Sequence, residues 1–132
     1  SPLRRAQETA AAFANKRADS VRVDSRFSEV RSPVPLSDRK VWLQEFMRQD
    51  WSKQSDDLWE WRRDILSGLK EATGPTVVFC HFLVINAVIA EIENKPEVVQ
   101  VYPANASFHE LKLAGGELSL VQLGQQMETR IN

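Results

Sequence analysis

Residues 76–90 read TVVFCHFLVINAVIA, an apolar run that holds one histidine. Its first five residues are mostly β-branched and follow Pro75, a pattern that predicts a strand buried on both faces, as in a parallel sheet. Ile85, Val88 and Ile89 then recur at helical spacing, which predicts a buried helix. His81 is therefore expected between the end of a strand and the start of a helix.

This position of His81 suits the binding of an anion. In open α/β sheets, ligands bind outside the carboxyl ends of the strands, and a helix N-terminus offers free N–H groups at the positive end of its dipole. An imidazole there can donate a hydrogen bond to a phosphoryl oxygen. The position alone leaves an alternative equally open, namely a core histidine that bonds a backbone carbonyl.

The rest of the chain predicts a single α/β domain over residues 1–132, a three-layer α/β/α sandwich around a mostly parallel sheet with an antiparallel edge. Besides 76–80, the strands with clear sequence signals form only a hairpin at the edge of the sheet. A central strand is therefore expected to be missing from this chain. The other predicted elements are a helix from Ser1-Pro2, a weak strand at 21–23, helices that begin near Ser37 and Ser55, and a hairpin of 108–113 with 117–123.

Composition limits the kinds of partner. The 17 Lys and Arg residues balance 18 Asp and Glu, so the net charge of −1 gives no reason to expect nucleic acid or an anionic membrane. The single cysteine, Cys80, excludes an internal disulfide, and the longest apolar run is too short to span a bilayer. A cytoplasmic protein is the expectation.

Arg5 is the second residue whose position suggests an anion site. It lies near the start of the first predicted helix, where a basic residue opposes the helix dipole. Its neighbours Leu3 and Ala6 belong to the apolar stripe, so we expect Arg5 to point inward, and its guanidinium fork matches a phosphate bidentately. An ordinary surface arginine is the alternative, and without further context the commoner one.

Several segments, taken in order, resemble the histidine phosphatase superfamily, which includes the phosphoglycerate mutases. SPLRRAQETA (1–10) is similar to the SPLxRAxQTA signature, and TVVFCHFLVINAVIA to the second histidine motif. DSRFSEV (24–30) resembles the segment that carries the acidic proton donor. SDDLWEWRRDILSGL (55–69) and YPANASFHELKL (102–113) resemble a later helix and the closing loop and strand. The resemblance implies a phosphoglycerate mutase-like fold.

The resemblance also implies a mechanism without metal or cofactor, in which a histidine attacks phosphorus and water hydrolyses the phosphohistidine. By position, Arg5 becomes a phosphate ligand and His81 the second catalytic and phosphate-binding histidine. Glu29 becomes the candidate proton donor, and Asp24 is the second candidate. The alternative for Glu29 is an ordinary solvated charge on a loop. Phe82 stands in the phosphate-binding motif where the family often has glycine, and its ring can line the substrate pocket.

One departure from the family is large. The Arg-His-Gly motif, which carries the nucleophile, is not in these 132 residues; the two histidines are His81 and His109, and His109 is expected to be structural or exposed. The nucleophile is therefore expected upstream of Ser1, and this chain alone is expected to be inactive.

The leading interpretation is a phosphatase whose partner is a small phosphorylated metabolite. A phosphoglycerate mutase-type transfer and a non-catalytic phosphate-binding or interaction domain remain as alternatives. Residues 32–51 are expected to wall the pocket. Exposed tryptophans among the four in the chain would mark a dimer interface, although the sequence does not give the oligomeric state.

Overall fold

The computed structural model describes residues 1–17 and 20–128. Within that part of the chain, no helix is both long enough and apolar enough to cross a membrane. The regular elements are the helices α1 (Arg4–Arg17), α2 (Arg39–Phe46), α3 (Asp56–Lys70) and α4 (Phe82–Glu93), the strands β1 (Glu110–Ala114) and β2 (Glu117–Gln122), and the short 3-10 turns η1 (Ser25–Phe27), η2 (Leu36–Asp38) and η3 (Trp51–Lys53).

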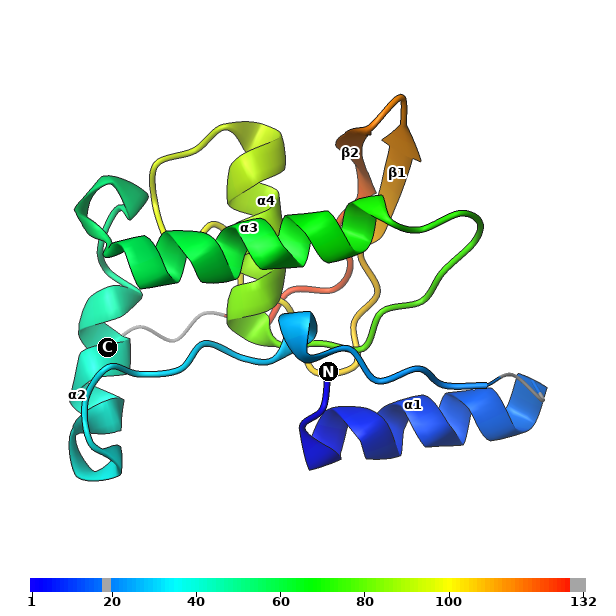
Figure 1. Cartoon of the computed structure of the whole chain (residues 1–132), viewed down its shortest axis with the longest axis horizontal. Helices are drawn as coiled ribbons and strands as arrows, with labels where there is room; N and C mark the ends of the chain where they lie inside the picture. Colours follow the sequence, from blue (N-terminus) through cyan, green and yellow to red (C-terminus); the bar gives the residue numbers. More distant parts are fainter. Residues whose placement is uncertain (18–19, 129–132) are drawn as a thin grey trace.

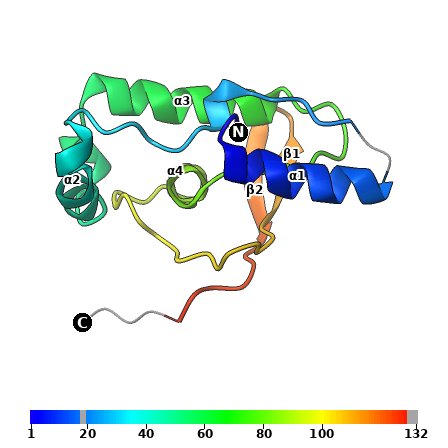
Figure 2. The same ribbon diagram turned by 90° about the horizontal axis from the view of Figure 1, so that it is seen from below.

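The core forms where α3 crosses α4 (Figure 1). Ile65, in the apolar stripe of α3, is completely buried. Helix α4 is buried around most of its circumference, and Val84 and Ala90 are among its most deeply buried residues. This explains why α4 is apolar on nearly every face, as its sequence predicts. Figure 2 shows α4 almost end-on, with α3 on one side and the loop that follows α4 on the other.

Asn86 holds that loop against α4. Its side chain is fully buried, and its Oδ1 accepts hydrogen bonds from the backbone N–H groups of Gln100, at 2.6 Å, and Val101, at 3.0 Å. Its Nδ2 donates to the carbonyl oxygens of Phe82 and Val101. A buried amide with all these bonds satisfied fixes the path of the loop towards Tyr102.

The tryptophans lie in or against the core. Trp51 is buried, and Trp42, Trp59 and Trp61 are partly buried and packed on the core cluster. The guanidinium of Arg62 lies 4.8 Å from the ring centres of both Trp51 and Trp59 and pairs with Glu91 at 2.6 Å. The prediction of an interface marked by exposed tryptophans therefore finds no support, since none of the four is exposed.

Residues 76–80 depart from the prediction. They run as an irregular extended segment before α4, Val77 is 48% exposed, and no described residue pairs with them in a sheet. The predicted strand buried on both faces is thus not formed, because a strand needs a neighbouring strand for its backbone hydrogen bonds. Contacts with the start of the chain and with α1 replace it: Phe79 accepts from the backbone nitrogen of Ser1, and its ring lies 5.7 Å from that of Phe13.

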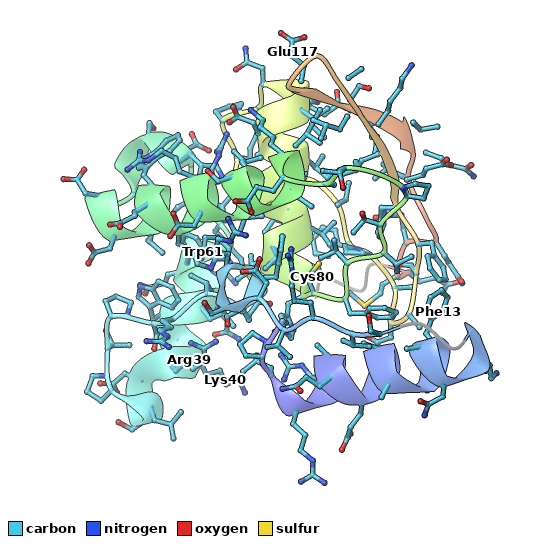
Figure 3. All side chains as sticks on the ribbon, turned by 45° about the vertical axis from the view of Figure 1, so that its right-hand side comes forward. Phe13, Arg39, Lys40, Trp61, Cys80 and Glu117 are labelled. Atoms are coloured by element: carbon cyan, nitrogen blue, oxygen red, sulfur yellow. The ribbon has the colours of Figure 1, made fainter. Side chains whose placement is uncertain are left out.

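The described sheet is small. It consists of β1 and β2 alone, paired antiparallel, and 21–23 is not a strand. The predicted hairpin is confirmed: Gly115 and Gly116 form its turn with φ of +60° and +78°, which two-residue hairpin turns require. Figure 3 shows Glu117 at the tip of this hairpin and Phe13 on α1. The described helices and the two-stranded antiparallel sheet are consistent with an α/β fold, while the parallel sheet and the three layers stay predictions.

Candidate functional site

His81 lies at the junction that the sequence predicts, directly before α4. Its backbone is extended (φ −138°, ψ 166°) and forms the N-cap of the helix, and its side chain is buried. The ring is held on both nitrogens: Nδ1 lies 3.3 Å from Nη2 of Arg5, and Nε2 lies 2.8 Å from Oγ of Ser1. The start of α1 and the start of α4 therefore meet at this imidazole, although Arg5 and His81 are 76 positions apart in the sequence.

These contacts decide which tautomer the histidine adopts. A guanidinium is only a donor, so Nδ1 must accept from Arg5, and the ring proton lies on Nε2. Nε2 then donates to Oγ of Ser1, which also accepts from the backbone N–H of Leu3 at 3.2 Å. The imidazole thus presents an N–H donor on the side of Ser1.

The environment keeps His81 neutral. Burial of the ring and the charge of Arg5 lower the pKa of His81. At neutral pH the group is therefore a hydrogen-bond donor without charge, and the positive charge beside it comes from Arg5.

Glu29 lies at the N-terminus of α4. Its Oε2 accepts from the backbone N–H of Leu83 at 3.3 Å, and its Oε1 from that of Val30 at 3.2 Å. Burial raises the pKa of Glu29, while these two hydrogen bonds and the charges of Arg5 and Arg39 act in the opposite direction. A carboxyl with a raised pKa is suited to donate a proton.

A basic pocket of about 560 Å³ adjoins Glu29. It opens between the start of α1 and residues 28–39, and Arg5, Arg31 and Arg39 all line it. Arg39 is held in place through a 3.2 Å hydrogen bond from its Nη2 to the carbonyl oxygen of Val30. Figure 3 shows Arg39 on the side of the molecule that α2 occupies. Three guanidinium groups around one opening favour a polyvalent anion such as a phosphate ester.

A second pocket, of about 370 Å³, also has Glu29 in its lining. Phe82 and Tyr102 line it with ring centres 5.8 Å apart at 60°, and so do Leu43 of α2 and Met47, the residue that caps the end of this helix. Leu83 and Met127 also line it. Glu29 is the residue that the two pockets share.

Comparison with known families identifies the chain. The family model of the histidine phosphatase superfamily (branch 1) matches residues 1–126. The chain belongs to this superfamily. The resemblance that rests on SPLRRAQETA and the later motifs is therefore confirmed. Neither the curated proteins nor the solved structures gave a match to the chain.

Membership of the histidine phosphatase superfamily supports a phosphatase- or mutase-type family in general. The structure brings together Arg5, His81 and Glu29, the three residues that the sequence assigned to phosphate binding and proton transfer. Arg5 was expected to point inward, and its guanidinium does contact His81. The residue is nevertheless exposed, and it lines the basic pocket.

Two other candidates from the sequence, Phe82 and Asp24, do not line the basic pocket. The ring of Phe82 lies in the apolar pocket and does not line the basic one, so its part in phosphate binding stays a prediction. Asp24 pairs with Arg26, at 2.7 Å between Nη2 and Oδ2, and the hydrogen bonds from Arg26 lower the pKa of Asp24 to about 2. A carboxyl so easily ionised is a poor proton donor, which favours Glu29.

His109 supports the hairpin. Its Nδ1 accepts from the backbone N–H of Gly124 at 3.0 Å, and its Nε2 lies 3.0 Å from Oγ of Ser107. Burial lowers the pKa of His109, and its ring lines neither pocket. The structural role expected for this histidine agrees with these contacts.

Sequence reasoning missed several of the lining residues. Arg31 and Arg39 lie on either side of the prolines at 33 and 35. Three arginines lie close together in the sequence between 26 and 39, but this spacing does not predict what they contact. Tyr102 and Met127 come from distant segments that meet only in the fold, where the N–H of Met127 donates to the carbonyl oxygen of Tyr102 at 2.6 Å. From the segment 32–51, Ser32, Leu36 and Arg39 line the basic pocket, and Leu43 and Met47 line the apolar one.

Among the described residues, no group of three or more His, Cys, Asp or Glu side chains is placed to hold a metal ion. The positive charge around the basic pocket comes from the side chains of Arg5, Arg31 and Arg39.

Proposed function

We propose that this protein hydrolyses a small phosphomonoester through a phosphohistidine intermediate. The observation that carries the proposal is the 3.3 Å contact between Arg5 and His81 at the edge of a pocket with two further arginines. Such a group of fixed donors stabilises the charge that develops on phosphoryl oxygens during transfer.

The first chemical step uses three residues of this chain. The nucleophilic histidine belongs to an Arg-His-Gly segment outside the 132 residues, and its ring nitrogen attacks phosphorus. As the bond between phosphorus and the ester oxygen breaks, Glu29 gives its proton to that oxygen, so that the leaving group departs as a neutral alcohol. Arg5 binds two phosphoryl oxygens. His81 supplies an uncharged N–H donor on Nε2, where a phosphoryl oxygen takes the place of Oγ of Ser1 as the acceptor.

The second step returns the enzyme to its starting state. A water molecule enters where the alcohol left, and the Glu29 carboxylate takes one of its protons as its oxygen attacks phosphorus. The nitrogen–phosphorus bond breaks, inorganic phosphate leaves, and Glu29 is again protonated.

The apolar pocket beside Glu29 favours hydrolysis over phosphoglycerate mutase-type transfer. A mutase must hold a second hydroxyl of a sugar acid in line with the phosphohistidine, which requires polar groups on the leaving-group side. Among the described residues that line this pocket, Glu29 alone is charged. A single domain over residues 1–132, a cytoplasmic location and a small phosphorylated metabolite as partner remain predictions from the sequence.

The proposal is tested on the full product of the gene that encodes this chain. We expect turnover of 4-nitrophenyl phosphate and a phosphohistidine, detected by mass spectrometry after a rapid quench, on the histidine of an Arg-His-Gly motif. The 132-residue chain alone is expected to give neither. A gene product without that motif and without turnover would instead support the non-catalytic phosphate-binding alternative.

A further inference from the structure

The substrate's leaving group can be inferred from the second pocket. Resting on the proposed phosphatase function, we infer that the preferred substrates are phosphomonoesters of aromatic or arylalkyl alcohols. Two adjoining pockets carry this inference, one basic and one apolar, with Glu29 at their boundary.

The boundary position of Glu29 sets where each part of the substrate lies. The oxygen that receives the proton joins the phosphoryl group to the leaving group, so it must lie beside the Glu29 carboxyl. The phosphoryl group then occupies the pocket lined by Arg5, Arg31 and Arg39, and the carbon part of the ester enters the other pocket that Glu29 lines.

The pocket that receives the leaving group is made of apolar side chains. Its volume of about 370 Å³ lies towards the lower end of the roughly 300–1,000 Å³ usual for small-molecule pockets. A sugar, sugar acid or nucleoside placed there would lose its hydration without gaining hydrogen-bond partners, which is unfavourable. An apolar group gains from the same burial.

The wall of the pocket favours an aromatic ring in particular. Phe82 and Tyr102 already pack as a tilted aromatic pair, and a third ring can add to it in an edge-to-face or offset arrangement. Met47 and Met127 line the same space, and their thioethers make favourable contacts with ring edges and adapt to rings of different shape.

This wall is fixed before any substrate binds. The buried amide of Asn86 holds Gln100 and Val101, the residues that lead into Tyr102. The carbonyl oxygen of Tyr102 accepts from Met127, and Phe82 begins α4 directly after His81. A preformed apolar wall gives selectivity because little ordering is needed on binding.

The test compares two alkyl esters with the full gene product: 2-phenylethyl phosphate and glycerol 3-phosphate. Both release a primary alkoxide, so that the chemistry at Glu29 is similar and the apolar ring is the difference between them. We expect a kcat/KM at least tenfold higher for 2-phenylethyl phosphate. Equal values, or a preference for glycerol 3-phosphate, would overturn the inference and leave the phosphatase function standing. No turnover of either ester would overturn the inference, and no turnover of 4-nitrophenyl phosphate as well would overturn the phosphatase function.

A pair of variants locates the selectivity. Leu43→Gln places an amide in the wall of the apolar pocket, and we expect it to reduce the ratio of the two kcat/KM values at least fivefold. Leu123→Gln makes the same change at an exposed leucine that lines neither pocket, and we expect the ratio to stay within twofold of wild type. An unchanged ratio in Leu43→Gln, with a wild-type melting temperature, would contradict the assignment of this pocket.

Discussion

Nη2 of Arg5 lies 3.3 Å from Nδ1 of His81, and this contact orients both groups. Because the arginine can only donate, it fixes the proton of the neutral imidazole on Nε2, and the imidazole in turn positions the guanidinium at the edge of the basic pocket. The first turn of α1 and the N-cap of α4 thus meet at this contact, and each side chain helps to hold the other in place.

The two histidines of the chain allow a matched comparison. His81→Ala removes a donor from the phosphate site, and we expect kcat/KM for an aryl phosphate to fall by about 10²- to 10³-fold in the full gene product. His109→Ala removes the partners of Gly124 and Ser107 instead, so we expect kcat/KM within threefold of wild type and a lower melting temperature. Similar kinetic losses in both variants would refute a specific role for His81.

Glu29→Gln tests the proton donor. We expect a loss of at least 10²-fold with an alkyl phosphate, which needs protonation of its leaving oxygen, and a smaller loss with 4-nitrophenyl phosphate, which does not. Burial raises the pKa of Glu29 above 4.5, so wild-type hydrolysis of the alkyl ester should fall as pH rises through that raised pKa. In the variant this decrease should disappear. Equal losses on both esters would exclude Glu29 as the acid.

Asp24→Asn should change stability and leave the leaving-group dependence intact. The pKa of Asp24 is lowered from 3.8 to about 2 through its bonds with Arg26, so its stabilising effect is complete above pH 3.8 and is lost as pH falls towards 2. At pH 7 we expect a loss of about 1–2 kcal/mol of unfolding free energy, measured in urea, that vanishes near pH 2. Asp38→Asn, at an exposed residue without a capping bond, is the control and should lose less than about 0.5 kcal/mol.

Arg62 should contribute to stability through its contacts with Trp51, Trp59 and Glu91. Arg62→Leu removes two cation–π contacts and a buried ion-pair partner, and we expect a loss of about 2–3 kcal/mol in denaturant unfolding. Arg63→Leu changes the next residue, which is exposed, and should alter stability by less than about 0.5 kcal/mol. A stability as high in Arg62→Leu as in Arg63→Leu would show that the tryptophan pair does not depend on the charge.

The local elements could be predicted from the sequence because their signals are local. The stripe of α3, the apolar helix after His81 and the Gly115-Gly116 hairpin follow from periodicity and turn chemistry within a few residues. The strand at 76–80 could not be judged in this way, because its formation depends on a partner strand that no described segment provides.

The candidate site, too, has residues that local sequence motifs mark and residues that only tertiary packing brings together. Arg5, Glu29 and His81 were predicted because the superfamily motifs mark them, and the structure places Arg5 in contact with His81 and beside Glu29 in one pocket. For the apolar pocket, the sequence indicated Glu29, Phe82 and the segment 32–51, but not Tyr102 or Met127, which come from the loop after α4 and the segment after β2. Tertiary packing alone brings those segments together.

The central claim is that Arg5 forms a phosphate site with His81, and binding of inorganic phosphate to the full gene product tests it most directly. Measured by isothermal titration calorimetry, the Kd for phosphate should rise at least tenfold in Arg5→Ala. It should stay within twofold of wild type in Arg4→Ala, where the neighbouring arginine is exposed and pairs with Glu8 on the surface. The same Kd in Arg5→Ala as in the wild-type protein would contradict the account.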